Sequence, residues 1–189
     1  MRKTISFLVV LVSLSVSTSA FAFQYAYAFH DPLMPSSAYR IDQDHKEYNS
    51  AYGKYHIGED RNRINVQECG DDAGDAVYSI ANGRVMYAQN AGPSWGNVII
   101  VRHILHDMTR VHSMYAHLQD SYASVGQEVS VGQQIGSIGD AGGYYPCAHL
   151  HFELRTDRTL EKIPGSGYAY WGDPIWNSHT DPSDFISSH

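Results

Sequence analysis

The chain has 189 residues and a formal net charge of −7, and it is 43% hydrophobic and 17% charged. This length suits one ordinary domain, and the hydrophobic fraction excludes a disordered chain. The acidic balance argues against a nucleic-acid-binding protein, which would need a basic surface. Eleven histidines stand against thirteen Lys and Arg residues. This excess favours metal chemistry, although a surface position without such a role is the ordinary alternative for most of them.

Residues 1–22 are predicted to be a secretory signal rather than part of the fold. A basic start is followed by a short apolar run, and the run ends in Ala20-Phe21-Ala22, a small-x-small cleavage site. A transmembrane helix would need about 20 apolar residues, and serines interrupt this run early. We expect cleavage after Ala22. The mature protein would then be exported, to the periplasm or the extracellular space, with no membrane anchor.

Export changes the interpretation of the two cysteines, Cys69 and Cys147. In an oxidising compartment such a pair is more often a disulfide than a redox or metal motif. A cysteine-protease dyad of Cys147 and His149 is a weaker alternative, because neighbours on one short segment rarely meet in the required geometry. We therefore expect a disulfide between Cys69 and Cys147.

The rest of the chain has a β pattern. Residues 23–50 show no steady hydrophobic period, so we expect an irregular lead-in that wraps the domain. From about residue 51, short segments rich in Val, Ile and Tyr are separated by glycine-containing turns, as in a sandwich or barrel. The clearest predicted strands are DAVYSI, GRVMYAQ, NVIIVRH, RVHSMYAHL, EVSVGQQIGSIG and HLHFELR. A helical turn is expected only at DPSDFI, capped by Asp181 or Ser183. The sequence thus predicts an all-β, Gly-rich antiparallel sandwich or barrel-like domain over residues 51–189, with little helix.

The segment HLHFELR carries the clearest chemical signal. Strand alternation sends its leucines and phenylalanine to one face and His149, His151 and Glu153 to the other. The two imidazoles would then stand side by side, about 6–7 Å apart at Cα. An ordinary polar strand face is the alternative, so this pair alone indicates a metal only weakly. For Glu153, a hydrogen bond to a ligand imidazole and exposure to solvent are equally open.

A second segment, YHIGED, contains His56 and Asp60. In an extended strand these residues would lie about 13 Å apart, too far to share one ion. Zinc takes donors at about 2.0–2.2 Å, so the chain would have to bend between them, and Gly58 would permit the bend. A surface turn without a metal is an equally good interpretation of this segment alone.

The third segment, RVHSMYAHL, supplies one more histidine. Alternation places His117 on the face of Tyr115, and puts His112 and Leu118 on the other face. Together the three segments supply a His, an Asp, an H-x-H pair and one more His. Three protein ligands and an open water position are the composition of a catalytic zinc site. Of the remaining histidines, we expect surface positions at hairpin ends for His103, His106, His112 and His179.

The motifs HIGED, YAHL and HLHFE, in this order and with a V-x-x-G-Q-x-I-G segment between the last two, resemble the lysostaphin-type (LytM-like) zinc endopeptidases. The resemblance covers residues 52–186. It implies a core built on the duplicated hybrid motif of that family, one Zn²⁺ per chain and peptidoglycan peptides as substrate. One departure stands out, because residues 144–148 read YYPCA where many relatives have a Gly-Pro or Gly-x turn.

Carried over residue by residue, the resemblance implies roles for five side chains. His56, Asp60 and His151 would hold the metal, and His117 and His149 would be the catalytic imidazoles. The implied reaction is attack of a zinc-activated water on an amide in a cross-link or stem peptide of peptidoglycan. The two catalytic histidines would orient that water and stabilise the oxyanion.

Two other functions are compatible with parts of this pattern. A non-hydrolytic member of the same family could bind peptidoglycan and activate a partner amidase, but such members usually lack one or more ligands, and this sequence lacks none. A sugar-phosphotransferase carrier domain shares the Gly-rich β architecture and paired histidines. That role is cytoplasmic and needs no H-x-x-x-D motif, so the predicted signal segment argues against it.

Overall fold

The computed structural model describes residues 24–65, 68 and 70–189. The predicted signal segment, its cleavage site and Cys69 lie outside the described residues. Among the helices of the described part, none is long and apolar enough to span a membrane.

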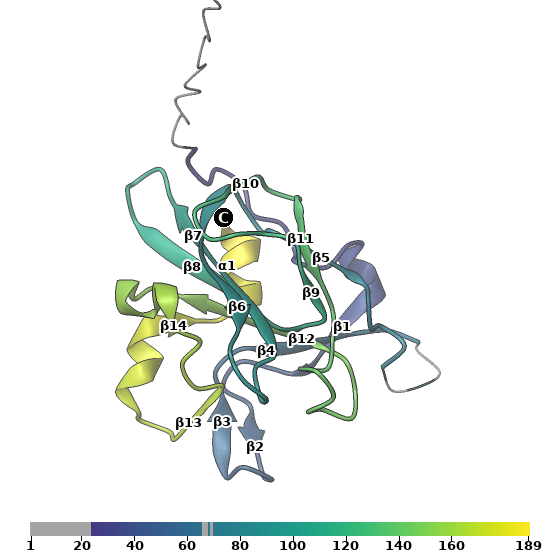
Figure 1. Ribbon diagram of the computed structural model, residues 1–189. Coiled ribbons are helices and arrows are strands. Elements are labelled where there is room, and N and C mark those ends of the chain that lie inside the picture. Colours follow the sequence, from purple (N-terminus) through teal and green to yellow (C-terminus); the bar gives the residue numbers. More distant parts are fainter. Residues whose placement is uncertain (1–23, 66–67, 69) are drawn as a thin grey trace, which may run out of the picture.

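Antiparallel strands make up most of the ordered structure (Figure 1). The strands are β1 (Tyr39–Gln43), β2 (Tyr48–Asn49), β3 (Lys54–His56), β4 (Glu59–Arg63), β5 (Ala76–Tyr78), β6 (Gly83–Asn90), β7 (Asn97–Ile104), β8 (Arg110–Leu118), β9 (Asp120–Ser121), β10 (Glu128–Val129), β11 (Gln134–Ser137), β12 (Leu150–Arg155), β13 (Tyr168–Ala169) and β14 (His179–Thr180). The helices are α1 (Pro182–Ser188) and the short 3-10 helices η1 (Ser36–Ala38), η2 (Arg158–Lys162) and η3 (Pro174–Ser178). The predicted all-β class with little helix is confirmed, and each predicted strand segment contains at least one strand.

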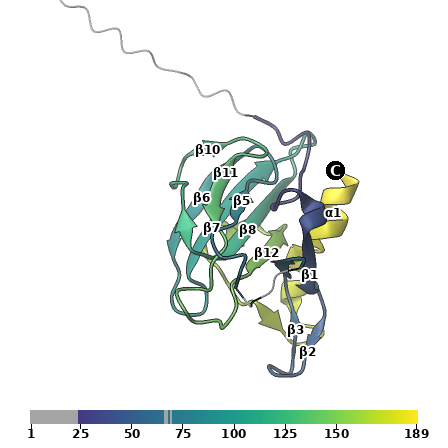
Figure 2. The ribbon, with the colours of Figure 1, turned by 90° about the vertical axis from the view of Figure 1, so that its right-hand side faces the viewer.

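The largest sheet has the strand order β1-β4-β12-β8-β7-β6-β10, with β14 added beside β12. A small sheet of β5, β11 and β9 faces it, and apolar residues of both sheets form one core, including Val77, Ile135, Ile99, Phe152 and Leu154. Figure 2 shows the two sheets from the side. The third sheet, of β13, β3 and β2, extends from the lower end of the molecule in Figure 1.

The second face of the main sheet is also covered. The 3-10 helix η2 contacts β6, β7 and β8, and Val98, Ile100, Met114 and Ala116 are fully buried on this side. The sequence showed the strands but not the connection that covers them.

Because both faces of the main sheet are packed against other parts of the chain, the expectation of surface positions for four histidines is wrong for three of them. His103 is buried beside Phe29 of the N-terminal segment, His112 is buried beside Glu161 of η2, and His179 is buried beside Glu153. His106 is exposed, as expected.

Two terminal segments complete the fold. Part of the region expected to be an irregular lead-in forms β1, which pairs with β4 from Tyr39↔Arg63 to Gln43↔Asp60. Most side chains of β1 are exposed, so the strand has no hydrophobic alternation that the sequence could reveal. At the other end, α1 begins after Asp181, whose carboxylate accepts a hydrogen bond from the Asp184 amide at 2.9 Å. This is the predicted cap.

Candidate metal centre

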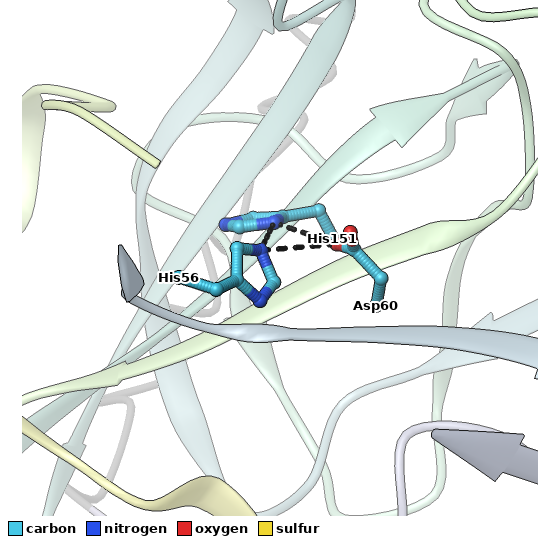
Figure 3. A group of neighbouring side chains, drawn as sticks. All are labelled: His56, Asp60 and His151. Carbon is cyan, nitrogen blue, oxygen red and sulfur yellow. Dashed lines mark hydrogen bonds and ion pairs between the residues drawn. The ribbon is translucent and has the colours of Figure 1, made fainter. Parts of the chain in front are cut away.

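His56, Asp60 and His151 converge on one point (Figure 3). His56 ends β3, and Asp60 lies in β4 directly opposite His151 of β12. The Nδ1 atom of His151 lies 2.9 Å from Asp60 Oδ1 and 3.1 Å from His56 Nε2, and His56 Nε2 lies 3.3 Å from Asp60 Oδ1. Two imidazole nitrogens and one carboxylate oxygen this close together match the donor types and spacing that a zinc ion requires.

The bend predicted between His56 and Asp60 is present, because β3 ends at His56 and β4 begins at Glu59. Gly58 lies in this bend, and a Cβ atom there would meet the Phe152 carbonyl oxygen at 2.5 Å and Glu153 Cγ at 2.8 Å. Its φ does not lie in the left-handed region. The glycine therefore serves close contact with β12 rather than an unusual backbone conformation.

Glu153 determines which nitrogen of His151 faces the centre. Its Oε1 accepts a hydrogen bond from His151 Nε2 at 2.8 Å, so Nδ1 is turned toward His56 and Asp60. The Glu153 carboxylate is fully buried and also accepts from Arg155 Nε at 2.7 Å, while His179 Nε2 lies 3.3 Å away. Of the two possibilities that the sequence left open for Glu153, the structure thus shows the hydrogen bond to His151. A carboxylate behind a histidine in this way fixes the orientation and the tautomer of its ring.

The ionisation of the centre follows from these contacts. Burial alone would lower the pKa of His151, but the hydrogen bonds to Asp60 and Glu153 outweigh burial and raise this pKa to about 9. For Asp60, burial would raise the pKa of the carboxyl, but hydrogen bonds from His151 and His56 hold it well below its usual value. Asp60 is therefore a carboxylate at neutral pH, as a metal ligand must be, whereas His151 carries a proton on each ring nitrogen in the metal-free protein and would release the one on Nδ1 when a metal binds there.

His117 reaches the same region through an irregularity of β8. Its φ is +62°, and the β7–β8 register has one additional residue on β8 between the pairs Asn97↔Leu118 and Ile99↔Tyr115. The predicted alternation is therefore wrong at the end of this strand, since Leu118 joins Tyr115 in the main core and His117 leaves that face. The bulge turns its ring toward β12.

The rings of His117 and His149 lie 4.7 Å apart between centroids, and His117 lies 5.5 Å from His151. The Nδ1 atom of His117 faces the Trp95 carbonyl at 3.3 Å. The Nδ1 atom of His149 faces the Cys147 carbonyl at 3.1 Å. A carbonyl can only accept, so we assign the proton of each neutral ring to Nδ1 and a lone pair to Nε2.

His149 also lies close to the three converging donor atoms. The Nε2 atom of His149 is 3.8 Å from Asp60 Oδ1. Burial, together with the nearby His151 and His149, lowers the pKa of His117 to about 2, so His117 is neutral at physiological pH. The Nε2 atom of each ring is the nitrogen that its backbone hydrogen bond leaves for a water or a substrate.

All five predicted side chains line one open cleft with a volume of about 310 Å³. Aromatic residues that the sequence analysis did not single out as site residues complete its walls, namely Tyr52, Trp95, Tyr144, Tyr145 and Tyr168. The indole of Trp95 stacks on His117 with centroids 5.8 Å apart and makes a T-shaped contact with His151 at 5.2 Å.

Residues 144–148, which depart from the family pattern, lie beside His117 and His149. The Tyr145 ring lies 4.6 Å from His117 and 5.0 Å from His149 between centroids. Cys147 is in a disulfide bond. Its predicted partner, Cys69, lies outside the described residues, so the pairing itself stays a prediction.

The sequence profile described as Peptidase family M23 matches residues 67–162, slightly more than half of the chain. This range contains His117, His149 and His151, whereas His56 and Asp60 precede it.

Curated relatives share part of the chain. Cell division protein DipM of Caulobacter vibrioides is 32% identical over 112 residues, which is 59% of this chain and 17% of that protein. Murein hydrolase activator NlpD of Escherichia coli is 39% identical over 82 residues, which is 43% of this chain and 20% of that protein. The matched part thus spans a fifth or less of the length of these two relatives.

Solved structures match more of the chain. A zinc containing peptidase from Vibrio cholerae is similar with a TM-score of 0.56 and 25% identity, over 82% of this chain and 39% of that chain. The catalytic domain of lysostaphin from Staphylococcus simulans has the same fold, with a TM-score of 0.57 and 24% identity, over 80% of this chain and 94% of that chain. From the profile match and the shared fold, the chain belongs to peptidase family M23.

Proposed function

We propose that the protein is an exported zinc metalloendopeptidase that hydrolyses cross-links or stem peptides of peptidoglycan. The observation that carries this proposal is the geometry of the cleft. His56, Asp60 and His151 present three donor atoms to one point, and His117 and His149 border the same cavity. Three protein donors beside an accessible cavity is the arrangement of a catalytic rather than a structural zinc site.

In this proposal His56 Nε2, Asp60 Oδ1 and His151 Nδ1 hold the ion. When bound, zinc would supply Lewis acidity, which polarises an amide carbonyl and lowers the pKa of a water toward ~7. Glu153 keeps His151 Nδ1 pointed at the centre, and Trp95 and Tyr145 pack against the catalytic rings.

His117 and His149 would handle protons and developing charge. Each holds its own proton on Nδ1 against a backbone carbonyl, so each Nε2 is left to accept a proton from the attacking water. Once protonated, the same nitrogen can donate to the oxyanion or to the leaving amine. Side-chain positions fixed by carbonyls and aromatic neighbours reduce the reorganisation that this step requires.

The names of the relatives favour a second function. NlpD of Escherichia coli is called a murein hydrolase activator, and the activating role would need a peptidoglycan-binding cleft but no turnover. The chain would then bind peptidoglycan and stimulate a partner amidase. The complete set of donor atoms, with His117 and His149 at the same cleft, favours the peptidase over this alternative.

Digestion of purified peptidoglycan, with products identified by mass, separates the two functions. We expect peptide bonds to be cleaved by the mature protein, cleavage to stop with a chelator, and Zn²⁺ to restore it. The matched control is the His149→Ala variant, which should keep the metal but lose cleavage. Absence of cleavage by metal-loaded protein, together with stimulation of an amidase on the same sacculi, would establish the activator instead.

A further inference from the structure

A second hollow lies next to the outer sheet of β2, β3 and β13, outside the metal cleft. It has a volume of about 390 Å³, and its lining includes Lys46, Trp171, Asp173, Trp176 and Asn177. The Trp171 side chain is 70% exposed, which is exceptional for an indole, because burial of its large apolar surface would be favourable. We call this feature the Trp171 hollow.

The two indoles are held in place by the surrounding structure. The Trp171 ring contacts the Tyr55 ring at 5.3 Å, and Tyr55 in turn contacts Tyr48 at 5.2 Å. The Nε1 atom of Trp176 donates to the Tyr170 carbonyl at 2.9 Å. Binding surfaces that use such preorganised aromatic rings lose little conformational entropy on binding.

Polar groups stand beside these rings. The Lys46 ammonium lies 6.0 Å from the centroid of Trp176, and Asp173 and Asn177 are exposed at the rim. A cavity with apolar ring faces and a few polar side chains is typical of a small-molecule site, which has a volume of roughly 300–1,000 Å³. The hollow therefore suits a ligand with one apolar face and a polar rim.

The hollow is linked to the metal cleft by side-chain contacts around His56. Tyr55, which contacts Trp171, directly precedes His56 in β3. On the other side, the His45 ring contacts Trp176 at 5.7 Å and donates from Nδ1 to the Ile57 carbonyl, next to His56. The side chains that contact Trp171 and Trp176 thus belong to, or hydrogen-bond, the residues on either side of His56, so the two places lie near each other and a branched polymer could occupy both at once.

We propose that the Trp171 hollow binds an amino-sugar ring of the glycan strand to which the substrate peptide is attached. This inference rests on the proposed function, because peptidoglycan is the polymer that places a sugar next to a peptide. One face of a pyranose ring exposes C–H groups, and packing these groups on an indole removes both surfaces from water. The hydroxyl and acetamido groups of the sugar project at the rim of the ring. Lys46, Asp173 and Asn177 offer donors and acceptors for those rim groups.

A protein partner fits this surface less well. A stable protein interface buries about 800 Å² on each partner, and charged residues are depleted at its centre. The Trp171 hollow is instead concave, small and interrupted by Lys46 and Asp173. Its size and mixed chemistry match one or two sugar rings.

The test is an NMR titration of the chelator-treated mature protein, so that no turnover is involved. The probe is a soluble tetramer of N-acetylglucosamine, followed by a sugar-free stem peptide. We expect the sugar to shift the indole N–H signals of Trp171 and Trp176. We expect the peptide to shift that of Trp95, in the metal cleft.

The Trp171→Ala variant should bind the tetramer about tenfold more weakly, since truncated aromatic anchors carry much of the affinity of such contacts. The matched control is Tyr27→Ala, because Tyr27 is an aromatic residue with 67% exposure away from the hollow. Equal affinity of the Trp171→Ala variant and the wild-type protein for the tetramer would overturn the proposal. So would shifts of the Trp171 and Trp176 indole signals that are caused by the peptide alone or only by a partner amidase. A protein that binds the tetramer but cleaves no peptidoglycan would refute the proposed peptidase and leave the sugar site intact.

Discussion

At the scale of single residues, the histidines of the cleft differ in which ring nitrogen the protein holds. In His117 and His149 a backbone carbonyl faces Nδ1, and Nε2 is left available. In His151 the Glu153 carboxylate takes Nε2, and Nδ1 faces Asp60 and His56. In the proposed roles, these hydrogen bonds leave Nδ1 of His151 for the metal and Nε2 of His117 and His149 for protons, which leads to two predictions about variants.

The first prediction separates metal binding from catalysis. Replacing His56, Asp60 or His151 with Ala should lower zinc content and activity together. Replacing His117 or His149 with Ala should keep near-stoichiometric zinc while turnover falls roughly 10²–10⁴-fold, the range for an acid–base or oxyanion group. Zinc measured by mass spectrometry beside turnover decides the matter. Loss of zinc in the His149 variant with retention in the His151 variant would reverse the assigned roles.

The second prediction concerns Glu153 as a positioning residue. Glu153→Gln keeps the shape but weakens the hold on His151 Nε2, so zinc affinity should fall about 10–100-fold. Glu153→Ala should also reduce the free energy of unfolding by about 3–5 kcal/mol, because it leaves Arg155 buried without its carboxylate. Competition with a metal chelator and chemical denaturation measure the two effects. The control is the exposed Glu128→Gln, whose ion pair with Arg84 spans 3.8 Å, and it should change neither quantity appreciably.

At the scale of elements, β8 shows where strand periodicity stops being informative. The alternation in HLHFELR is confirmed, because Leu150, Phe152 and Leu154 are in the core and His151 faces the cleft. The same reasoning failed at His117, since a bulge adds one residue on β8 and changes the face. A bulge depends on how two strands pair, so it has no signature in the sequence of one strand.

The burial of individual histidines could not be predicted from the sequence either, because it too depends on contacts with other parts of the chain. Whether His103 or His112 meets water depends on Phe29 and on η2, which are distant in the chain. The three residues that converge on one point could be named because their motifs resemble those of a known family, whereas their spacing alone left a surface turn and a polar strand face open. The aromatic walls, such as Trp95 and Tyr168, could not be predicted, because Trp95 lies in a turn and Tyr168 in the short strand β13, which only the folded chain brings together.

The buried His103 leads to a prediction on pH. Its Nδ1 donates to the Asn82 carbonyl and its Nε2 accepts from Ser113, and burial lowers its pKa from 6.5 to about 4. Between these values the unfolded chain binds the proton and the folded protein does not. Stability is therefore fully present above pH 6.5 and falls by about 3 kcal/mol as the pH drops to 4.

Urea denaturation between pH 4 and 7 measures this dependence. The His103→Gln variant should show a flatter pH dependence than the wild-type protein, whereas the exposed His106→Gln should not. An unchanged slope in the His103 variant would show that other groups cause the acid sensitivity.

At the scale of the whole molecule, the covalent form can be checked by mass. We expect the exported protein to begin at Phe23 and to carry a Cys69–Cys147 disulfide. Closing so long a loop would stabilise the fold by about 4 kcal/mol in the chain-entropy model, whose mechanism is disputed. Mass spectrometry of the exported protein and of its non-reduced peptides tests both points. An intact Met1 would contradict the first, and two free thiols in the oxidised, denatured protein would contradict the second.

The pairing of β1 with β4 has a consequence for solubility. β4 carries Asp60, and β1 occupies its outer side up to the pair Gln43↔Asp60. Without residues 24–50, the backbone N–H and C=O groups of β4 would be open to strands of other molecules, which is a common route to aggregation. We expect a protein that begins at residue 51 to self-associate in light scattering at concentrations where the longer chain does not. Residues 24–50 would thus prevent self-association by covering the edge of β4.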